Sequence, residues 1–238
     1  YHRNNLERGF TQVIDVLGAD PIEEHREVVA ALRAFDLPAE RVRPVIYQFV
    51  TLTRHGEQVK MSTRRAEYVT LDELVDEVGV DAAPFFFLSR KSDSHLEFDL
   101  ELAKKRSNDN PVFYVQYAHA RIANLFAQAR LQGVEPPTDA LGVEALAPLQ
   151  QPEEIDVIRA LASFGDIVGL AARELEPHRL VFFLQELAAA FHRFYNQHRI
   201  LGDELPSRIA ARLALAEAVR RVLRLGLGTL GVAAPERM

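Results

Sequence analysis

Residues 110–133, NPVFYVQYAHARIANLFAQARLQG, combine a helical start signal, an apolar periodicity and a stop signal in one stretch. Pro111 suits the first turn of a helix, and Gly133 is a typical residue just beyond a helix end. Apolar residues recur at helical spacing and are expected to face the interior of a bundle: Val112, Val115, Ile122 and Leu125. The stretch therefore predicts one long, partly buried helix.

The chain that follows predicts more helices and almost no strands. A proline-rich connector covers 134–152, and helical patterns cover 153–174, 177–200 and 205–231, with a break expected near Gly165. Together with 110–133 these segments predict an all-α helical bundle.

The chain before residue 90 instead alternates between predicted strands and predicted helices. A short strand over 13–17, a helix over 21–35 and a second strand over 43–52 form the pattern of a parallel crossover unit. Thr70 with Glu73 is a capping box for the next helix, and Asp81 begins another. The predicted fold class is α/β followed by all-α.

Composition limits the partners. The chain has 238 residues, no cysteine and a net charge of −6, and no apolar run approaches the roughly 20 residues of a membrane span. Its acidic balance argues weakly against nucleic acid, but charge distribution matters more than the sum. The segment from Pro206 onward contains six arginines and only two glutamates, which predicts a basic patch.

A cluster of cations and hydroxyls follows the second predicted strand in GEQVKMSTRRAEYVTLDEL, residues 56–74. Lys60 suits a phosphate oxygen, Arg64 offers a bidentate fork, and Ser62 and Thr63 offer hydroxyl donors. By spacing alone the alternative is an ordinary solvated turn.

Aromatic residues in one of the predicted helices suit RNA bases. Tyr114, Tyr117 and Arg121 share one helix face, and an aromatic pair beside an arginine is a plausible stacking platform for unstacked bases. The alternative is that the tyrosines pack in the core with their hydroxyl groups satisfied. Phe191 and Phe194 are expected to be core residues.

Several histidines and acids carry no assigned chemistry. His192 and His198 are six residues apart and do not share a helix face, so no metal site is expected there. KSDSHLEFD, residues 91–99, is interpreted as a connector rather than a metal or acid–base site. His25, His55 and His119 are treated as isolated.

The sequence resembles a known family. KMSTR resembles the second signature of class I aminoacyl-tRNA synthetases, and VTLDELVDEVGVDAA, YVQYAHARI and the final APERM resemble arginyl-tRNA synthetases in particular. The resemblance runs from Tyr1 to Met238. It implies the C-terminal part of such an enzyme: the second half of a Rossmann-type catalytic domain with its connector over 1–106, and a helical anticodon-binding domain over 107–238.

The resemblance implies an arginine–tRNA ligase as the parent protein, using ATP with Mg²⁺, L-arginine and tRNA-Arg, cytoplasmic and monomeric. The first class I signature lies outside the sequence, so the chain alone is expected to be inactive in adenylation. A non-catalytic RNA-binding module of the same family, or a helical interaction domain without RNA function, is the alternative.

The implied site residues fall into four groups, with no protein-bound metal. Catalysis is assigned to Lys60, Ser62 and Arg64; ATP contact to Gly18, Asp20, Lys60, Met61 and Ser62; and arginine contact to Tyr1. Contact with tRNA is assigned to Tyr114, Tyr117, Arg121, Tyr195, Asn196, Arg199, Arg208, Arg212 and Met238. The sequence departs from the family where Pro21 and Ile22 replace two histidines and where Pro84 replaces an arginine.

Overall fold

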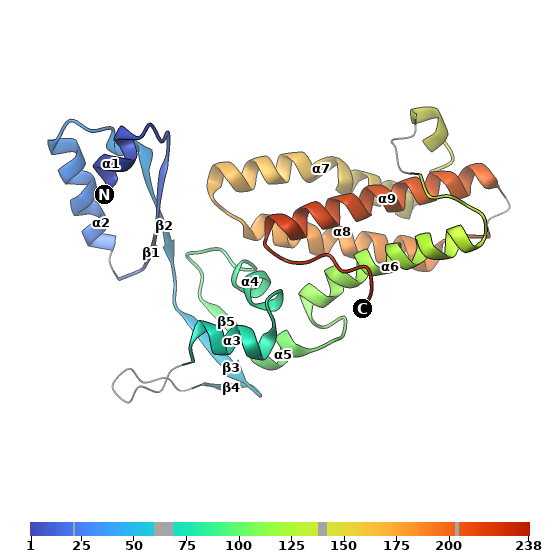
Figure 1. The fold of residues 1–238 in the computed structure, drawn as a ribbon, viewed down its shortest axis with the longest axis horizontal. Helices are drawn as coiled ribbons and strands as arrows, with labels where there is room; N and C mark the ends of the chain where they lie inside the picture. Colours follow the sequence, from blue (N-terminus) through green and yellow to red (C-terminus); the bar gives the residue numbers. More distant parts are fainter. Residues whose placement is uncertain (21, 60–68, 138–141, 203–204) are drawn as a thin grey trace. The chain divides into compact units, whose positions relative to one another are not determined.

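The computed structural model describes residues 1–20, 22–59, 69–137, 142–202 and 205–238. The chain forms two compact units (Figure 1): Tyr1–Val59 with Arg90–Phe98, and Lys60–Ser89 with Asp99–Met238. The predicted domain boundary at residue 106 stays a prediction.

The first unit contains the predicted strand–helix–strand crossover. Strands β1 (Val13–Gly18) and β2 (Val42–Tyr47) are parallel, with Val13 opposite Val42 and Gly18 opposite Tyr47. Helix α2 (Ile22–Ala34) connects them, after α1 (His2–Glu7), and the short helix η1 (Ala39–Arg41) precedes β2. The core joins residues from all these elements: Leu6, Val13, Leu32, Ala39 and Val42. This arrangement confirms the predicted parallel unit.

The prediction of one strand over 43–52 is wrong. The segment is divided between β2 and β3 (Val50–Arg54), which lie in different sheets. The pairing changes at Gln48, whose backbone N–H donates to the Ser92 carbonyl at 2.9 Å. Strand β3 pairs with β4 (Glu57–Gln58) and with β5 (Leu96–Asp99), so part of the expected connector over 91–99 is a strand.

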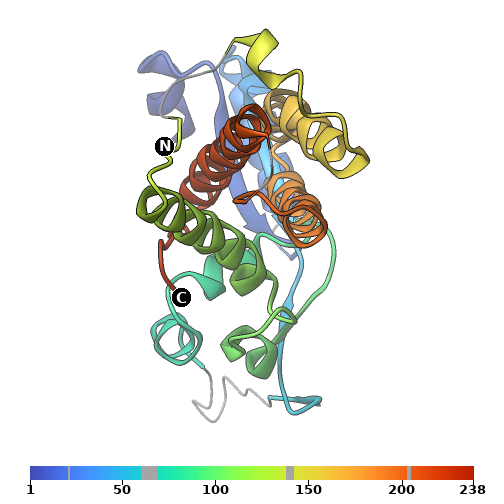
Figure 2. The same cartoon turned by 90° about the vertical axis from the view of Figure 1, so that its right-hand side faces the viewer.

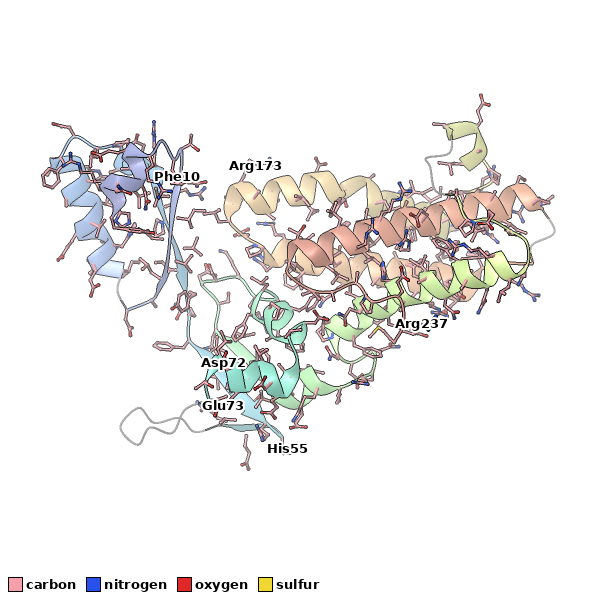
Figure 3. The ribbon with its side chains drawn as sticks, viewed as in Figure 1. Phe10, His55, Asp72, Glu73, Arg173 and Arg237 are labelled. Carbon is pink, nitrogen blue, oxygen red and sulfur yellow. The ribbon has the colours of Figure 1, made fainter. Side chains whose placement is uncertain are left out.

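The second unit begins with short capped helices. Helix α3 (Leu71–Val78) has the predicted capping box, in which Thr70 and Glu73 bond reciprocally. Helix α4 (Ala82–Phe87) follows with Phe85 and Phe86 buried, and α5 (Leu100–Lys104) is capped by the Asp99 carboxylate. Figure 3 labels Glu73 at the start of α3.

Four long helices form the bundle: α6 (Pro111–Leu131), α7 (Pro152–Glu174), α8 (His178–Gln197) and α9 (Pro206–Thr229). Figure 2 shows them side by side. A short 3-10 helix, η3 (Val143–Leu146), lies in the connector after α6. Fully buried residues fill the interior, among them Val115, Ile122, Leu184, Leu187, Leu213 and Leu223. The four predicted helices are confirmed, but α7 runs unbroken through Gly165.

Candidate nucleic-acid interface

An aromatic cluster lies where α6 meets α8. Tyr114 and Tyr117 come from one face of α6, and His192 of α8 packs against both rings, with centroid distances of 4.7 Å and 5.6 Å. Phe113 stacks on Tyr117 at 6.2 Å. The helical spacing of three residues brings the two tyrosines together, as the sequence predicted.

Arg121 is held over this cluster by three contacts. Its Nη2 donates to Asn196 Oδ1 at 2.7 Å, and its Nη1 donates to His192 Nδ1 at 3.3 Å. Its guanidinium carbon lies 4.0 Å from the centroid of the Tyr195 ring, a distance typical of a cation–π contact. The guanidinium plane is therefore fixed in position before any ligand arrives.

These contacts select one tautomer of His192. Its Nδ1 accepts from Arg121, and its Nε2 lies 3.5 Å from the Tyr114 carbonyl, to which it donates. Burial lowers the pKa of His192; the bond to the Tyr114 carbonyl raises it, and the nearby Arg121 charge lowers it further. The ring is therefore neutral near pH 7, which suits an acceptor for the guanidinium.

One side of the cluster is open to solvent. Tyr117 is 37% exposed, and Asn196 and Arg193 are also exposed. Burial raises the pKa of the Tyr114 hydroxyl, against a smaller lowering by Arg193, so the hydroxyl stays protonated at neutral pH. The surface combines ring faces, an amide and fixed cations.

A polar hollow of about 400 Å³ adjoins the cluster at the end of α8. Its walls include Leu125 and Gln128 of α6 with Tyr195, Asn196 and Arg199. The volume lies within the range of small-ligand pockets in proteins, about 300–1,000 Å³.

The predicted arginines separate into two environments. Arg199 is exposed and Arg208 is half-buried, but Arg212 is only 4% exposed. Its Nε donates to Glu154 at 2.7 Å and its Nη1 donates to the Arg199 carbonyl at 3.0 Å. Because this guanidinium is engaged in the bundle core, we leave Arg212 out of the interface.

The remaining predicted site residues lie elsewhere. In the first unit, Gly18 ends β1, Asp20 is exposed just before α2, and Tyr1 is 90% exposed with its ring edge-on to His2. Met238 is 53% exposed at the end of the chain. Lys60, Met61, Ser62 and Arg64 lie outside the described residues, as does Pro21.

Three histidines have roles that the sequence analysis missed. His192 is central to the cluster, His119 is bonded to the Pro235 carbonyl, and His25 lies 3.2 Å from the Asp15 carboxylate, which also bonds His2. The signal for His119 and His192 was their place among apolar residues on buried helix faces. Within the described ranges, no group of acids and histidines fits a metal ion, and no helix could cross a membrane.

Comparison with known proteins agrees with this geometry. The family model of the DALR anticodon binding domain matches residues 115–238. Over its whole length the chain is 51% identical to an arginine–tRNA ligase of Acidithiobacillus ferrooxidans and 48% identical to one of Citrifermentans bemidjiense. The chain spans only 41% and 42% of the lengths of those enzymes.

Solved structures of arginyl-tRNA synthetases also resemble this chain. A Campylobacter jejuni structure described as an arginyl-tRNA synthetase superposes with a TM-score of 0.88 at 28% identity, covering 100% of this chain and 50% of that one. The arginyl-tRNA synthetase of Thermus thermophilus gives 0.74 at 26% identity, covering 96% and 41%. The resemblance to arginyl-tRNA synthetases is thus confirmed in sequence and in fold.

The matched family region contains the polar hollow and all of the aromatic cluster except Phe113 and Tyr114. It begins within α6 and includes the other three bundle helices together with the C-terminal segment. This region is more than half of the sequence. The chain therefore belongs to the family of the DALR anticodon binding domain.

Proposed function

We propose that the cluster of Tyr114, Tyr117, Arg121, His192, Tyr195 and Asn196 binds the anticodon loop of tRNA-Arg. The observation that carries this proposal is the fixed guanidinium of Arg121, held between the Tyr195 ring and two hydrogen-bond partners. Anticodon bases lie in a single-stranded loop, and proteins bind bases of such loops by splaying them out and stacking them on aromatic rings or guanidinium planes.

Polar groups around the cluster suit base edges and phosphates. Gln128 and Asn196 in the hollow carry both amide donors and acceptors, so they can pair with the hydrogen-bonding edge of a base. Arg193 and Arg199 are exposed next to these residues and would contact the phosphate backbone. Arg208 and Met238 remain proposed contacts of the same surface.

A direct test measures tRNA-Arg binding by filter retention at two salt concentrations. Tyr195→Ala should weaken binding roughly 5- to 150-fold, since one stacked base is worth about 1–3 kcal/mol. Phe182→Ala is the control. It removes an aromatic side chain that is 45% exposed and that lies on the same helix, α8, but outside the aromatic cluster. Equal affinities for the two variants, or binding that ignores salt, would contradict the proposal.

We further propose that the parent protein is a monomeric, cytoplasmic arginine–tRNA ligase that uses L-arginine, ATP and Mg²⁺. The first unit would belong to its Rossmann-type catalytic domain, over 1–106, with Tyr1 at the arginine and Gly18 and Asp20 at the ATP. In support, β1 leaves Ile14 and Val16 44% and 64% exposed, although parallel sheets are normally covered on both faces.

For the catalytic residues we retain Lys60, Ser62 and Arg64, with Met61, at the ATP phosphates. The chain alone is proposed to be inactive, because it lacks the first class I signature. Arginine-dependent pyrophosphate exchange by the purified 238-residue chain would contradict this. The replacement of two family histidines by Pro21 and Ile22 keeps a non-catalytic RNA-binding module as the second candidate; an intact first signature in the parent sequence would exclude it.

A further inference from the structure

The C-terminal segment, residues 231–238, is turned back onto the bundle by the end of α9. Gly231 has a φ of +73°, and its N–H bonds to the Gly228 carbonyl while the Val232 N–H bonds to the Leu227 carbonyl at 2.9 Å. This pair of bonds is a Schellman motif, which reverses the chain direction at a glycine. Val232 is then buried, so the segment continues along the protein surface.

The Asp81 carboxylate, the Gln116 side-chain amide and the Ala233 backbone form a closed ring of hydrogen bonds. One Asp81 oxygen accepts from the Ala233 N–H at 2.9 Å, and the other accepts from Gln116 Nε2 at 2.8 Å. Gln116 Nε2 also donates to the Ala233 carbonyl at 2.9 Å. Both backbone groups of Ala233 are therefore bonded to side chains from distant parts of the second unit.

Asp81 is used in an unusual way. It precedes α4 at the N-cap, where an aspartate commonly accepts from the first backbone N–H groups of the helix. Its side chain makes no such cap bond to the described start of α4. Both carboxylate oxygens are instead directed at the C-terminal segment and at α6.

A second anchor lies two residues further along. His119, which is 1% exposed, donates from Nδ1 to the Pro235 carbonyl at 2.8 Å. Gln116 and His119 belong to α6, so the segment is bonded to the helix that also carries Tyr114, Tyr117 and Arg121 of the aromatic cluster. Figure 3 shows Arg237 beside α6, and Met238 lies within about 10 Å of Pro235 because three residues can span no more.

We propose that Asp81 is a positioning residue of the RNA interface, which holds the C-terminal segment on α6 so that Arg237 and Met238 contact RNA that is bound at this helix. This inference rests on the proposed anticodon function. Arg237 supplies a cation for a phosphate, and Met238 supplies an adaptable apolar surface for a base. Asp81 itself would not touch the RNA.

The sign of the effect separates positioning from charge. Removing an aspartate from a chain of net charge −6 should strengthen RNA binding if charge alone matters. Asp81→Ala is instead expected to weaken tRNA-Arg binding about ten-fold, and Asp81→Asn should weaken it as well. Asp166→Ala on α7, which removes an equal and exposed charge, should leave binding equal or slightly stronger.

A double-variant cycle tests whether Asp81 acts through the segment. Deleting Arg237 and Met238 should also weaken binding about ten-fold, and combining the deletion with Asp81→Ala should add less than two-fold. Multiplying losses would overturn the proposal, as would unchanged binding by both single variants while Tyr195→Ala still weakens it. Absence of tRNA binding by the unaltered chain would instead overturn the anticodon function, and this inference with it.

Positioning also has a readout without RNA. The sequence contains two methionines, Met61 and Met238, so methyl-labelled protein gives two signals. Asp81→Ala should sharpen the Met238 signal and shift it toward the position of an unstructured chain, without changing the Met61 signal. A Met238 signal identical to that of the unaltered protein would overturn the positioning role even if the variant melts at a lower temperature.

Discussion

Replacing Arg212 by methionine removes one partner of an ion pair inside the bundle. The Arg212 and Glu154 side chains are 5% and 0% exposed, and Nε lies 2.7 Å from the carboxylate. Without the guanidinium, the Glu154 carboxylate keeps the bond from the Gln151 N–H at 2.9 Å but loses its counter-charge. Breaking a buried pair in this way costs about 3–5 kcal/mol, or roughly 6 to 20 °C in melting temperature for a domain of this size.

Thermal and urea unfolding of the purified chain give this cost directly. Arg193→Met is the matched control, since Arg193 is exposed and its loss should change stability by less than about 0.5 kcal/mol. Adding Glu154→Leu to Arg212→Met should recover most of the loss, because no unpaired charge then remains. At 10 °C, where the variant stays folded, tRNA-Arg affinity should be unchanged. Normal stability combined with weaker, less salt-dependent tRNA binding would refute this account and restore Arg212 as a phosphate contact.

Two further predictions concern packing and pH. Gly226→Ala should destabilise the bundle by about 1–3 kcal/mol, because the new Cβ would lie 2.6 Å from Leu184 Cδ2. Gly228→Ala places its Cβ in open space and should stabilise the helix by up to about 1 kcal/mol. Equal urea unfolding midpoints for the two variants would contradict this prediction. Burial lowers the pKa values of His119 and His192, so the unfolded chain takes up protons first and stability should fall as pH drops below about 6.5. Replacing both histidines by glutamine should flatten the urea midpoint between pH 7.5 and 5.5, and an equally steep dependence would count against this assignment.

Local signals in the sequence were sufficient for most of the fold. The proline and glycine around 110–133 and the Thr70 capping box each depend on neighbours within a few residues, and the crossover before residue 60 follows from the order of three consecutive elements. The division of 43–52 into two strands was not predictable in this way. It depends on the backbone bond between Gln48 and Ser92, which are distant in sequence.

The site was predictable where helical spacing decides which residues meet. Tyr114, Tyr117 and Arg121 share a face of α6 as expected, and Asn196 is bonded to Arg121. The burial of Arg212 was not predictable, because an arginine on a helix is usually solvated and only the packing of α7 against α9 places Glu154 beside it. The hydrogen bond between Asp81 and Ala233 was also not predictable, because it joins residues that are far apart in the chain.

The most direct test of the interface is the affinity of Arg121→Ala for the isolated anticodon stem-loop of tRNA-Arg, measured by fluorescence anisotropy. Arg159→Ala is the matched control, since it removes an equal charge from an exposed position on α7. The account predicts at least a ten-fold loss for Arg121→Ala and less than a two-fold change for Arg159→Ala. Equal affinities of the two variants for the stem-loop would contradict the assignment of the aromatic cluster as the anticodon-binding site.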